Sequence, residues 1–389
     1  GVAEGGVAWS AAVEAGEEVG DVMHEGVLVA DAKAGHVAAA PLSDGEAWHH
    51  FQAGQAGVID SARFLVAFGV VPFVANEYWL QAILIPFLIF SVAAVGLNLL
   101  TGYAGQVSLG TGAFMAVGAY ATYKITTNIP EINIIIVFLL SGGIAALVGI
   151  LFGLPSLRIK GFYLAVATLA AQFFILWLFN KVGWFFNDNP SGTITAPPRT
   201  FLGIMVTGPR ATAETRYLIC LVFLTVFAMA AKNIVRGRIG RSWMAIRDMD
   251  IAAEIIGIQP LKAKLLAFAI SSFYCGVAGA LSVFAWLGSA ETEAFDIFVS
   301  FQVLFMIIIG GLGSIMGSIL GAAFITLVPI FLTNAPAMFN IPMGTDLSKH
   351  IEEIVFGGLI VYLLIVEPNG FARLWQIAKE KLRQWPFPY

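Results

Sequence analysis

The sequence predicts an all-α polytopic membrane protein. Of its 389 residues, 58% are hydrophobic and only 12% are charged, which leaves too little polar surface for a soluble domain of this length. Apolar runs as long as the roughly 20 residues that cross a bilayer recur from about Leu80 to Val366. Both cysteines, Cys220 and Cys275, lie inside such runs, so neither a disulfide framework nor a metal site is expected.

Residues 1–60 do not share this apolar pattern. They hold ten acidic side chains and one basic one, Lys33, and show no sustained amphipathic period. Such a segment cannot bury enough apolar area to offset its chain entropy, and it lacks the basic start and apolar core of a signal peptide. Its four histidines are compatible with metal binding. The preferred interpretation is an acidic extension that is disordered or an artefact, because the chain starts at Gly1 rather than Met.

The membrane domain is predicted over residues 61–370 as about ten transmembrane or re-entrant helices, followed by a cytoplasmic tail at 371–389. The predicted helices are 62–76, 78–100, 106–126, 132–154, 161–180, 216–233, 263–288, 294–312, 315–333 and 351–366. The first is short and the third is repeatedly interrupted by glycine, which makes these two the least regular of the set.

Lys and Arg in the connecting loops predict the orientation, because cytoplasmic loops carry an excess of these residues. With both termini in the cytoplasm, the cytoplasmic loop at 232–264 alone holds seven of them. The outer side receives only Lys124, Lys181, Arg199, Arg210, Arg216 and Lys349. The long connection at 181–216 then lies outside, and its Pro, Gly, Asn and Thr content predicts an ordered, irregular loop. It either receives a binding protein or simply joins two helices.

The cytoplasmic loop is predicted to contain one short amphipathic helix, from Ser242 to Ile256. Its apolar face is Ile246, Met249, Ala253 and Ile256, and another face carries Arg247, Asp250 and Glu254. Gly257 can adopt the left-handed conformation that ends a helix, and Pro260 prevents continuation. The small Ala252 and Ala253 permit close approach by another protein. A helix lying on lipid headgroups is the alternative, which the mixed charges disfavour because such helices favour Lys and Arg.

Two glycine-rich interruptions lie within the apolar runs, at 96–120 and 307–324. Broken backbone at membrane depth is tolerated where it is buried in protein or lines a watery cavity, and transporters use broken helices in paired repeats to bind substrate. The first interruption supplies four candidates for a substrate pathway: Asn98, Gln106, Ser108 and Thr111. The alternative is helix packing through small residues such as Gly112 and Ala116, which accounts for most of the glycines but not for the polar side chains.

The chain contains no G-x-x-x-x-G-K-[ST] sequence for cradling phosphates, so energy must come from a partner or from an ion gradient. A gradient-driven carrier normally needs a buried ionisable side chain, and the candidates, Glu293, Asp296, Glu352 and Glu353, lie at predicted helix ends. An intramembrane enzyme needs a convergent set of His or carboxylate groups, and the only His beyond residue 60 is His350. A transport subunit driven by a separate ATPase is therefore favoured.

Six blocks occur in order along the chain: GLNLLTGYAGQVSLGTGAFMAVGAYAT, LRIKGFYLAVATLA, GRSWMAIRDMDIAAEIIGI, KLLAFAISSFYCGVAGAL, IGGLGSIMGSILGAA and VEPNGFARLW. In this order and spacing they resemble the M-type permease of branched-chain amino acid ABC importers, over about residues 62–375. The resemblance implies a bacterial inner-membrane subunit with a second similar permease, two cytoplasmic ATPases and a periplasmic substrate-binding protein as partners. It implies that the ATPase uses ATP and Mg, while this chain contacts membrane lipid and binds no cofactor and no nucleic acid.

The resemblance also implies roles within the cytoplasmic loop. Ala252, Ala253 and Gly257 resemble the Ala-Ala-x-x-x-Gly core of the importer coupling loop, although the Glu that often precedes this core is Ile251 here. The residues expected to couple to the ATPase are Arg241, Arg247, Asp248, Ala252, Ala253, Glu254 and Gly257. The implied substrates are branched-chain or related amino acids, with urea, short amides and aromatic acids as alternatives.

Overall fold

The computed structural model describes residues 68–69, 71–156, 163–189, 193–201, 204–208 and 211–338, with a few separate positions between 354 and 377. All of them belong to one compact unit, Phe64–Tyr389. Residues 1–60 lie outside the described residues, as do parts of the predicted helices 62–76 and 351–366 and most of the predicted tail.

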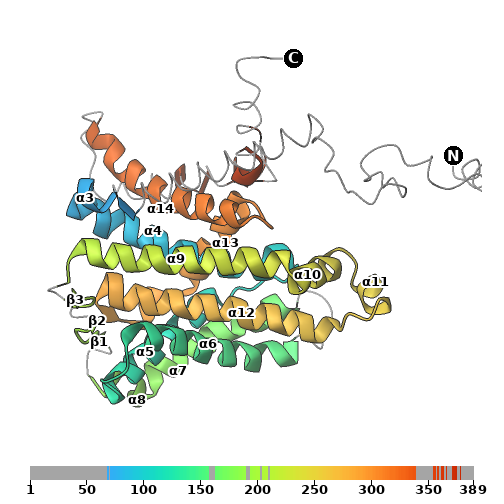
Figure 1. Ribbon diagram of the computed structural model, residues 1–389, viewed down its shortest axis with the longest axis horizontal. Coiled ribbons are helices and arrows are strands. Elements are labelled where there is room, and N and C mark those ends of the chain that lie inside the picture. Colours follow the sequence, from blue (N-terminus) through green and yellow to red (C-terminus); the bar gives the residue numbers. More distant parts are fainter. Residues whose placement is uncertain are drawn as a thin grey trace, which may run out of the picture. The chain divides into compact units, whose positions relative to one another are not determined.

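The described part is largely helical (Figure 1). Its long helices are α4 (Ile85–Asn98), α5 (Thr111–Asn128), α6 (Ile134–Ser156), α7 (Tyr163–Lys181), α9 (Ala213–Arg236), α12 (Pro260–Leu281), α13 (Ile297–Gly310) and α14 (Ile315–Met338). Shorter ones are α3 (Val71–Val74), α8 (Gly183–Phe186), α10 (Arg238–Asp248) and α11 (Asp250–Ile255). Wider π-helical turns extend two of the long helices: η2 (Trp79–Leu84) and η3 (Leu99–Tyr103) flank α4, and η4 (Ser282–Leu287) follows α12.

Seven helical stretches of the described residues are long and apolar enough to cross a membrane. They are Trp79–Tyr103, Ile134–Pro155, Leu164–Lys181, Ala213–Arg236, Pro260–Leu287, Thr292–Gly310 and Ile315–Leu332. Each coincides with a predicted helix, which confirms the all-α polytopic membrane fold. The predicted helix at 106–126 corresponds to α5, which starts only at Thr111 and whose Thr, Tyr, Lys and Asn content makes it more polar than the seven.

Helices α4 and α12 form the centre of this bundle. In their membrane-length stretches 83% and 78% of the residues are buried, against 28% to 39% in the other five, so the outer helices present broad faces to lipid or to a partner subunit. Helix α12 packs on α4, α5 and α6. Its contact with α5 brings two backbones together, because a Cβ atom on Gly118 would lie 1.9 Å from the carbonyl oxygen of Gly276. Only glycine permits this close approach of two helices.

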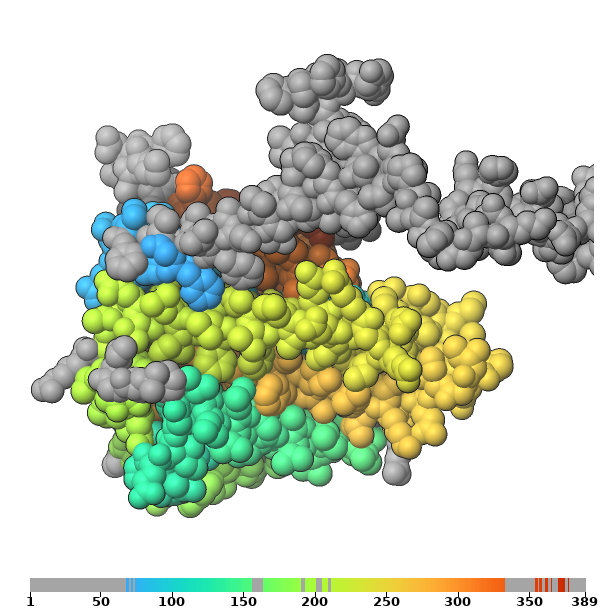
Figure 2. All heavy atoms as spheres, in the orientation of Figure 1, coloured from blue at the N-terminus to red at the C-terminus, as the bar shows by residue number. Residues whose placement is uncertain are grey.

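The two ends of the bundle carry different structures (Figure 1). At one end lie α8 and the short strands of the 181–216 connection. Strand β1 (Ile194–Thr195) pairs antiparallel with β4 (Ser289–Ala290), and β2 (Thr200–Phe201) pairs with β3 (Ile204–Met205). At the other end, α10 and α11 project beyond the long helices, as the yellow segment in Figure 2 shows. The two loops predicted on opposite sides of the membrane therefore lie at opposite ends of the bundle.

Candidate coupling and transport site

The first glycine-rich interruption is a break between two helices. Helix α4 continues through η3 to Tyr103, residues 104–110 are non-helical, and α5 begins at Thr111. Gly105 has a φ of +69°, a left-handed conformation that costs other residues strain. The chain can therefore leave the helix at Tyr103 and cross to the start of α5 without continuing the helical direction.

The side chains after Gly105 alternate between two environments, as they do in extended backbone. Gln106 and Ser108 are buried in the bundle, whereas Val107 and Leu109 are partly exposed. Two of the predicted pathway residues thus point into the protein. The surface of the break is lined instead by apolar side chains, a division that composition alone does not predict.

Three of the predicted pathway residues have poorly satisfied polar atoms. Gln106 is 6% exposed, yet neither Nε2 nor Oε1 has a hydrogen-bond partner among the described residues, and Thr111 Oγ1 has none either. Ser108 Oγ accepts only a 3.4 Å hydrogen bond from the N–H of Gly110. Because an unpaired buried polar group costs about 1–3 kcal/mol, these atoms are candidate contacts for a polar ligand.

The beginning of α5 is held by side chains that the sequence analysis did not select. The N–H of Gly112 donates to Ser300 Oγ at 2.8 Å, the N–H of Ala113 donates to Gln172 Oε1 at 2.7 Å, and Ser300 donates to the same Gln172 oxygen at 3.0 Å. Thr168 Oγ1 accepts from the N–H of Leu109 at 2.9 Å. The first N–H groups of a helix lack intrahelical partners, so α7 and α13 satisfy this buried helix start. The available signal was a polar Gln172 within an apolar run.

Asn98 joins the two glycine-rich interruptions. The side chain is 1% exposed, and its Nδ2 donates to the carbonyl oxygen of Ser314 at 2.9 Å and to Ser318 Oγ at 2.6 Å. Its Oδ1 accepts from the N–H of Gly313 at 2.9 Å. Asn98 therefore attaches the second break to α4. This structural role differs from the predicted role of Asn98 as a pathway residue.

The loop at 232–264 contains two helices, so the prediction of one helix from Ser242 to Ile256 is wrong. Helix α10 ends at Asp248, Met249 is extended with φ −153° and ψ 96°, and α11 starts at Asp250. Asp250 lies in the first turn of α11, where a negative charge is favourable, and pairs with Lys264 on α12 at 2.7 Å. This exposed ion pair lies at a helix start that the three-and-four periodicity does not reveal.

The break at Met249 changes the predicted apolar face. Ile246 and Ala253 are buried, at 3% and 2% exposed, as predicted for that face. Met249 and Ile256 are instead 69% and 73% exposed. Together with Ile251 at 72% and Ile255 at 80%, they form an apolar patch on α11 and its flanks, a feature that marks interaction surfaces. The Ile251 that replaces the family's Glu belongs to this patch.

The other predicted coupling residues are mostly at the surface. Arg241, Asp248, Ala252 and Glu254 are exposed. Gly257 has a φ of +88°, which confirms the predicted left-handed stop. Ala253, in contrast, packs inside this chain and is not available to another protein.

Arg247 connects α10 to the first break. Its Nη1 donates to the carbonyl oxygen of Gly102 at 2.8 Å, and its Nε pairs with Asp248 at 3.0 Å. Its aliphatic part covers Gly105, since a Cβ atom there would lie 2.8 Å from Arg247 Cγ. Gly102 in turn adjoins the second break, because a Cβ on it would lie 2.3 Å from the nitrogen of Gly313. Arg247 thus lies where the two interruptions meet.

Trp243 attaches the same helix to the centre of the bundle. Its side chain is fully buried, and its Nε1 donates to the carbonyl oxygen of Ala263 at 2.9 Å. Helix α10 is therefore attached both to α12, through Trp243, and to the end of η3, through Arg247. The sequence signal for this contact is a Trp within a charged loop, and it was not among the predicted coupling residues.

The ionisable side chains of the described residues are exposed or half-buried. No Asp, Glu, Lys, Arg or His is buried in the part of the chain that the structure describes, where the buried polar residues are Ser, Thr, Asn or Gln. Asp296 serves as the N-terminal cap of α13, accepting from the N–H of Val299 at 3.2 Å, and Glu293 is exposed. The other candidates for the competing functions, Glu352, Glu353 and His350, lie outside the described residues. No cluster of metal ligands occurs within the described residues.

Comparison with known proteins identifies the family. The model of the family described as "Branched-chain amino acid transport system / permease component" matches residues 79–364. The chain belongs to this family. The matched region contains both breaks, Arg247 and the projecting helices α10 and α11. No solved structure matches the chain.

Similar relatives include permeases with different named cargoes. The chain is 28% identical over 308 residues to the high-affinity branched-chain amino acid transport system permease protein LivM of Salmonella typhimurium, covering 73% of this chain and 67% of that protein. It is 28% identical over 306 residues to LivM of Escherichia coli, with the same coverage. It is also 27% identical over 290 residues to the ribose import permease protein RbsC of Haemophilus influenzae, covering 72% of this chain and 81% of that protein.

The family and the fold together fix the general role of the chain. It is a LivM-type permease subunit of an ABC importer and a multi-pass protein of the inner membrane. As a permease of this class it is a transport subunit that works with ATPase and substrate-binding partners.

Proposed function

We propose that this permease forms one half of a translocation pathway for branched-chain or related amino acids and transmits ATPase movements to it. In the proposed complex it pairs with a second similar permease, two cytoplasmic ATPases that use ATP and Mg, and one periplasmic binding protein. This chain itself binds no nucleotide and no cofactor. The names of the two LivM relatives support the substrate class, and the name of RbsC makes a sugar the competing cargo.

The observation that carries the proposal is the position of Arg247. It extends from the projecting α10 and donates to the backbone of Gly102, beside the nitrogen of Gly313. A partner that moves α10 therefore acts on both breaks through one charged hydrogen bond, a class of bond worth about 1.5–3 kcal/mol. Gln106, Ser108 and Thr111, which follow Gly102 in the chain, are the proposed polar contacts of the cargo.

The proposed docking surface for the ATPase is α11 with its flanks. Its apolar patch lies beside the exposed Ala252 and Glu254. An apolar centre with a polar rim is the usual anatomy of a protein interface. The patch consists of Met249, Ile251, Ile255 and Ile256. In the proposed orientation this end faces the cytoplasm. A cysteine at Arg241 should then resist an impermeant maleimide in intact cells, whereas one at Thr195 should react.

The decisive experiment compares Arg247→Ala with Arg238→Ala in the reconstituted complex. Loss of the bond to Gly102 is expected to lower uptake of leucine roughly 10-fold or more, while insertion and ATPase association persist. Arg238→Ala removes an exposed charge from the same helix, for which the described residues show no such bond, and serves as the matched control. Full uptake and normal stimulation of ATP hydrolysis by loaded binding protein in Arg247→Ala would contradict the proposal, and uptake of ribose but not leucine would reassign the cargo.

A second pair of variants separates docking from folding. Ala252 is exposed, so Ala252→Trp should leave the bundle intact and reduce co-purification of the ATPase by about 10-fold, as expected for an interface contact worth about 1.4 kcal/mol. Ala253 is buried, so Ala253→Trp should lower the thermal stability of the permease itself, because overpacking costs about 1–3 kcal/mol. Equal ATPase binding by Ala252→Trp and the unchanged protein would exclude α11 as the docking surface.

A further inference from the structure

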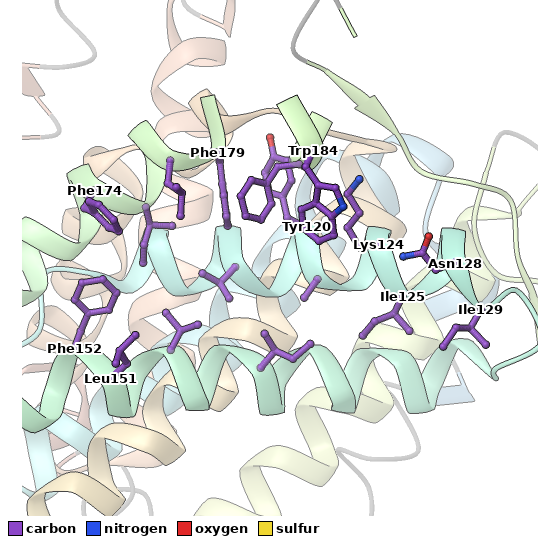
Figure 3. A pocket seen from close by; sticks show the side chains of 17 residues that line it. Tyr120, Lys124, Ile125, Asn128, Ile129, Leu151, Phe152, Phe174, Phe179 and Trp184 are labelled. Atoms are coloured by element: carbon purple, nitrogen blue, oxygen red, sulfur yellow. The ribbon is translucent and has the colours of Figure 1, made fainter. Parts of the chain in front are cut away.

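A groove of about 490 Å³ lies between α5, α6, α7 and α8, and neither the break at 104–110 nor Arg247 lines it (Figure 3). Helix α5 forms its floor, and α6 and α7 form its two walls. Its lining is apolar along most of its length, with Leu151, Phe152 and Phe174 at one end. Lys124 and Asn128 lie toward the other end, beside Trp184.

The groove opens on the lateral surface of the bundle, the surface that would face lipid. Leu151, Phe174 and Ile144 line it and are 69%, 49% and 37% exposed. Only 39% of the residues in the membrane-length stretches of α6 and α7 are buried. Because these faces are long and apolar, the groove is continuous with the surface that α6 and α7 present in the membrane.

Its length suits a lipid chain better than a compact solute. The lining residues of α5 run from Val117 to Ile129, and twelve helical steps at about 1.5 Å each give roughly 18 Å. One leaflet of a hydrocarbon core about 30 Å thick is close to this depth. An amino acid cargo, which carries two charges on one carbon, would find polar partners at one end alone.

The charged end has the composition of a phospholipid headgroup site. Lys124 Nζ donates to Asn187 Oδ1 and lies 4.5 Å from the ring centroid of Trp184. An ammonium has three N–H donors, so two remain for a phosphate. The exposed Asp188 follows Asn187 in the chain and supplies an anion for the amine of a zwitterionic headgroup. Trp and Lys are residues that anchor proteins at the membrane interface.

We propose that this groove binds a zwitterionic phospholipid of the bilayer, with one acyl chain between α6 and α7 and the phosphate at Lys124. The inference depends on the membrane fold and not on the cargo or the coupling route. Helix α5 then follows the first break at its start and contacts lipid from Val117 onward. Arg247 does not line the groove, so loss of the lipid should leave its bond to Gly102 in place.

The test is native mass spectrometry of the full-length permease in its complex, released from detergent after incubation with phosphatidylethanolamine. Val148→Trp should fill the groove and lower the retained lipid about 10-fold, and Lys124→Gln should lower it by roughly the same factor, as expected for loss of a charged hydrogen bond. Leu147→Trp, on the adjacent position of α6 but 67% exposed and outside the groove, is the matched control and should retain lipid normally. Lys181→Gln is the corresponding control for charge.

Three outcomes would overturn the proposal. The first is unchanged lipid retention in both Val148→Trp and Lys124→Gln. The second is an equal loss in Leu147→Trp, which would point to general damage to α6. The third is efficient cross-linking of a Leu151→Cys variant to a partner subunit in the assembled complex, which would make the groove a protein interface. If Val148→Trp does not fold, Ile144→Trp and Lys124→Gln carry the same comparison.

Discussion

In the break at 104–110, buried polar side chains keep atoms without partners, whereas in the break at 311–314 the polar groups are paired and the backbones are in contact. Gln106 and Thr111 carry the unpaired atoms of the first break. In the second, Asn98 bonds to Gly313 and Ser314, and a Cβ on Gly310 would lie 2.1 Å from the oxygen of Gly317. The same glycine-rich signal therefore produces a polar segment in one place and a closely packed connection between α13 and α14 in the other.

This difference suggests that the packed break contributes mainly to stability and the polar break mainly to transport. A substitution in the packed break should unfold or loosen the bundle, because nothing there can move without loss of contacts. A substitution of an unpaired group in the polar break should leave stability unchanged and alter transport. The three predictions below test this separation, from the largest expected loss of stability to the smallest.

Gly102→Val should have the largest effect. Its Cβ would lie 2.3 Å from the nitrogen of Gly313 and 2.0 Å from Asn98 Oδ1, so the two breaks would be forced apart. We expect a loss of about 3 kcal/mol or more, the upper range for overpacking, measured as a lower midpoint of thermal unfolding in detergent. Gly143→Val is the control, since a Cβ there meets nothing within 4 Å. Equal midpoints for the two variants would show that the breaks are not in tight contact.

Asn98→Leu should have an intermediate effect, and Gln106→Met almost none. The first leaves the N–H of Gly313 without its buried acceptor, a loss of about 2–3 kcal/mol, while the hydroxyl of Ser318 keeps its 3.2 Å bond to the carbonyl oxygen of Ser314. The second removes two atoms that have no partner among the described residues. Thermal unfolding measures the stabilities, and uptake should fall in Gln106→Met despite its unchanged midpoint. A lower midpoint in Gln106→Met than in Asn98→Leu would mean that Gln106, and not Asn98, is the structural residue of the pair.

Thr111→Val should be neutral or slightly stabilising. Its hydroxyl has no partner in the described residues, and replacing such a group with an apolar one of the same shape removes a desolvation penalty. Uptake should nevertheless fall about 5-fold, equivalent to roughly 1 kcal/mol. Thr122→Val on the same helix is the control, because its hydroxyl is bonded to the carbonyl oxygen of Gly118 at 2.8 Å. If uptake fell equally in both variants, Thr111 would have no special contact with the cargo.

The sequence was sufficient for the membrane helices and insufficient for the contacts between them. Hydropathy located the seven apolar stretches because each depends on consecutive residues. It failed at Met249, where the backbone is extended between α10 and α11 while the apolar period continues unbroken. It also failed to separate Asn98 from Gln106, since both are amides in one glycine-rich run and only contacts with the distant Gly313, Ser314 and Ser318 distinguish them.

Side-chain direction was the second limit. The periodicity of a helix indicates which residues share a face, but the segment at 104–110 is not helical, and in it Gln106 and Ser108 are buried while Val107 is partly exposed. The groove on α5 was equally invisible, because it needs the walls supplied by α6 and α7. Sequence patterns describe one element at a time, and these features belong to two or three.

The bond from Asn98 to Ser318 has a consequence for biosynthesis. Its two residues are 220 positions apart, and at a synthesis rate of about 5–20 residues per second the second partner follows the first by roughly 10–40 s. During that interval the amide of Asn98 has entered the bilayer without its final partner. The nascent α4 must therefore wait for α14 at the insertion machinery or beside a substitute donor. Ribosome pausing between these segments, or a chain truncated before residue 314, would leave a polar group in lipid that quality-control proteases can recognise.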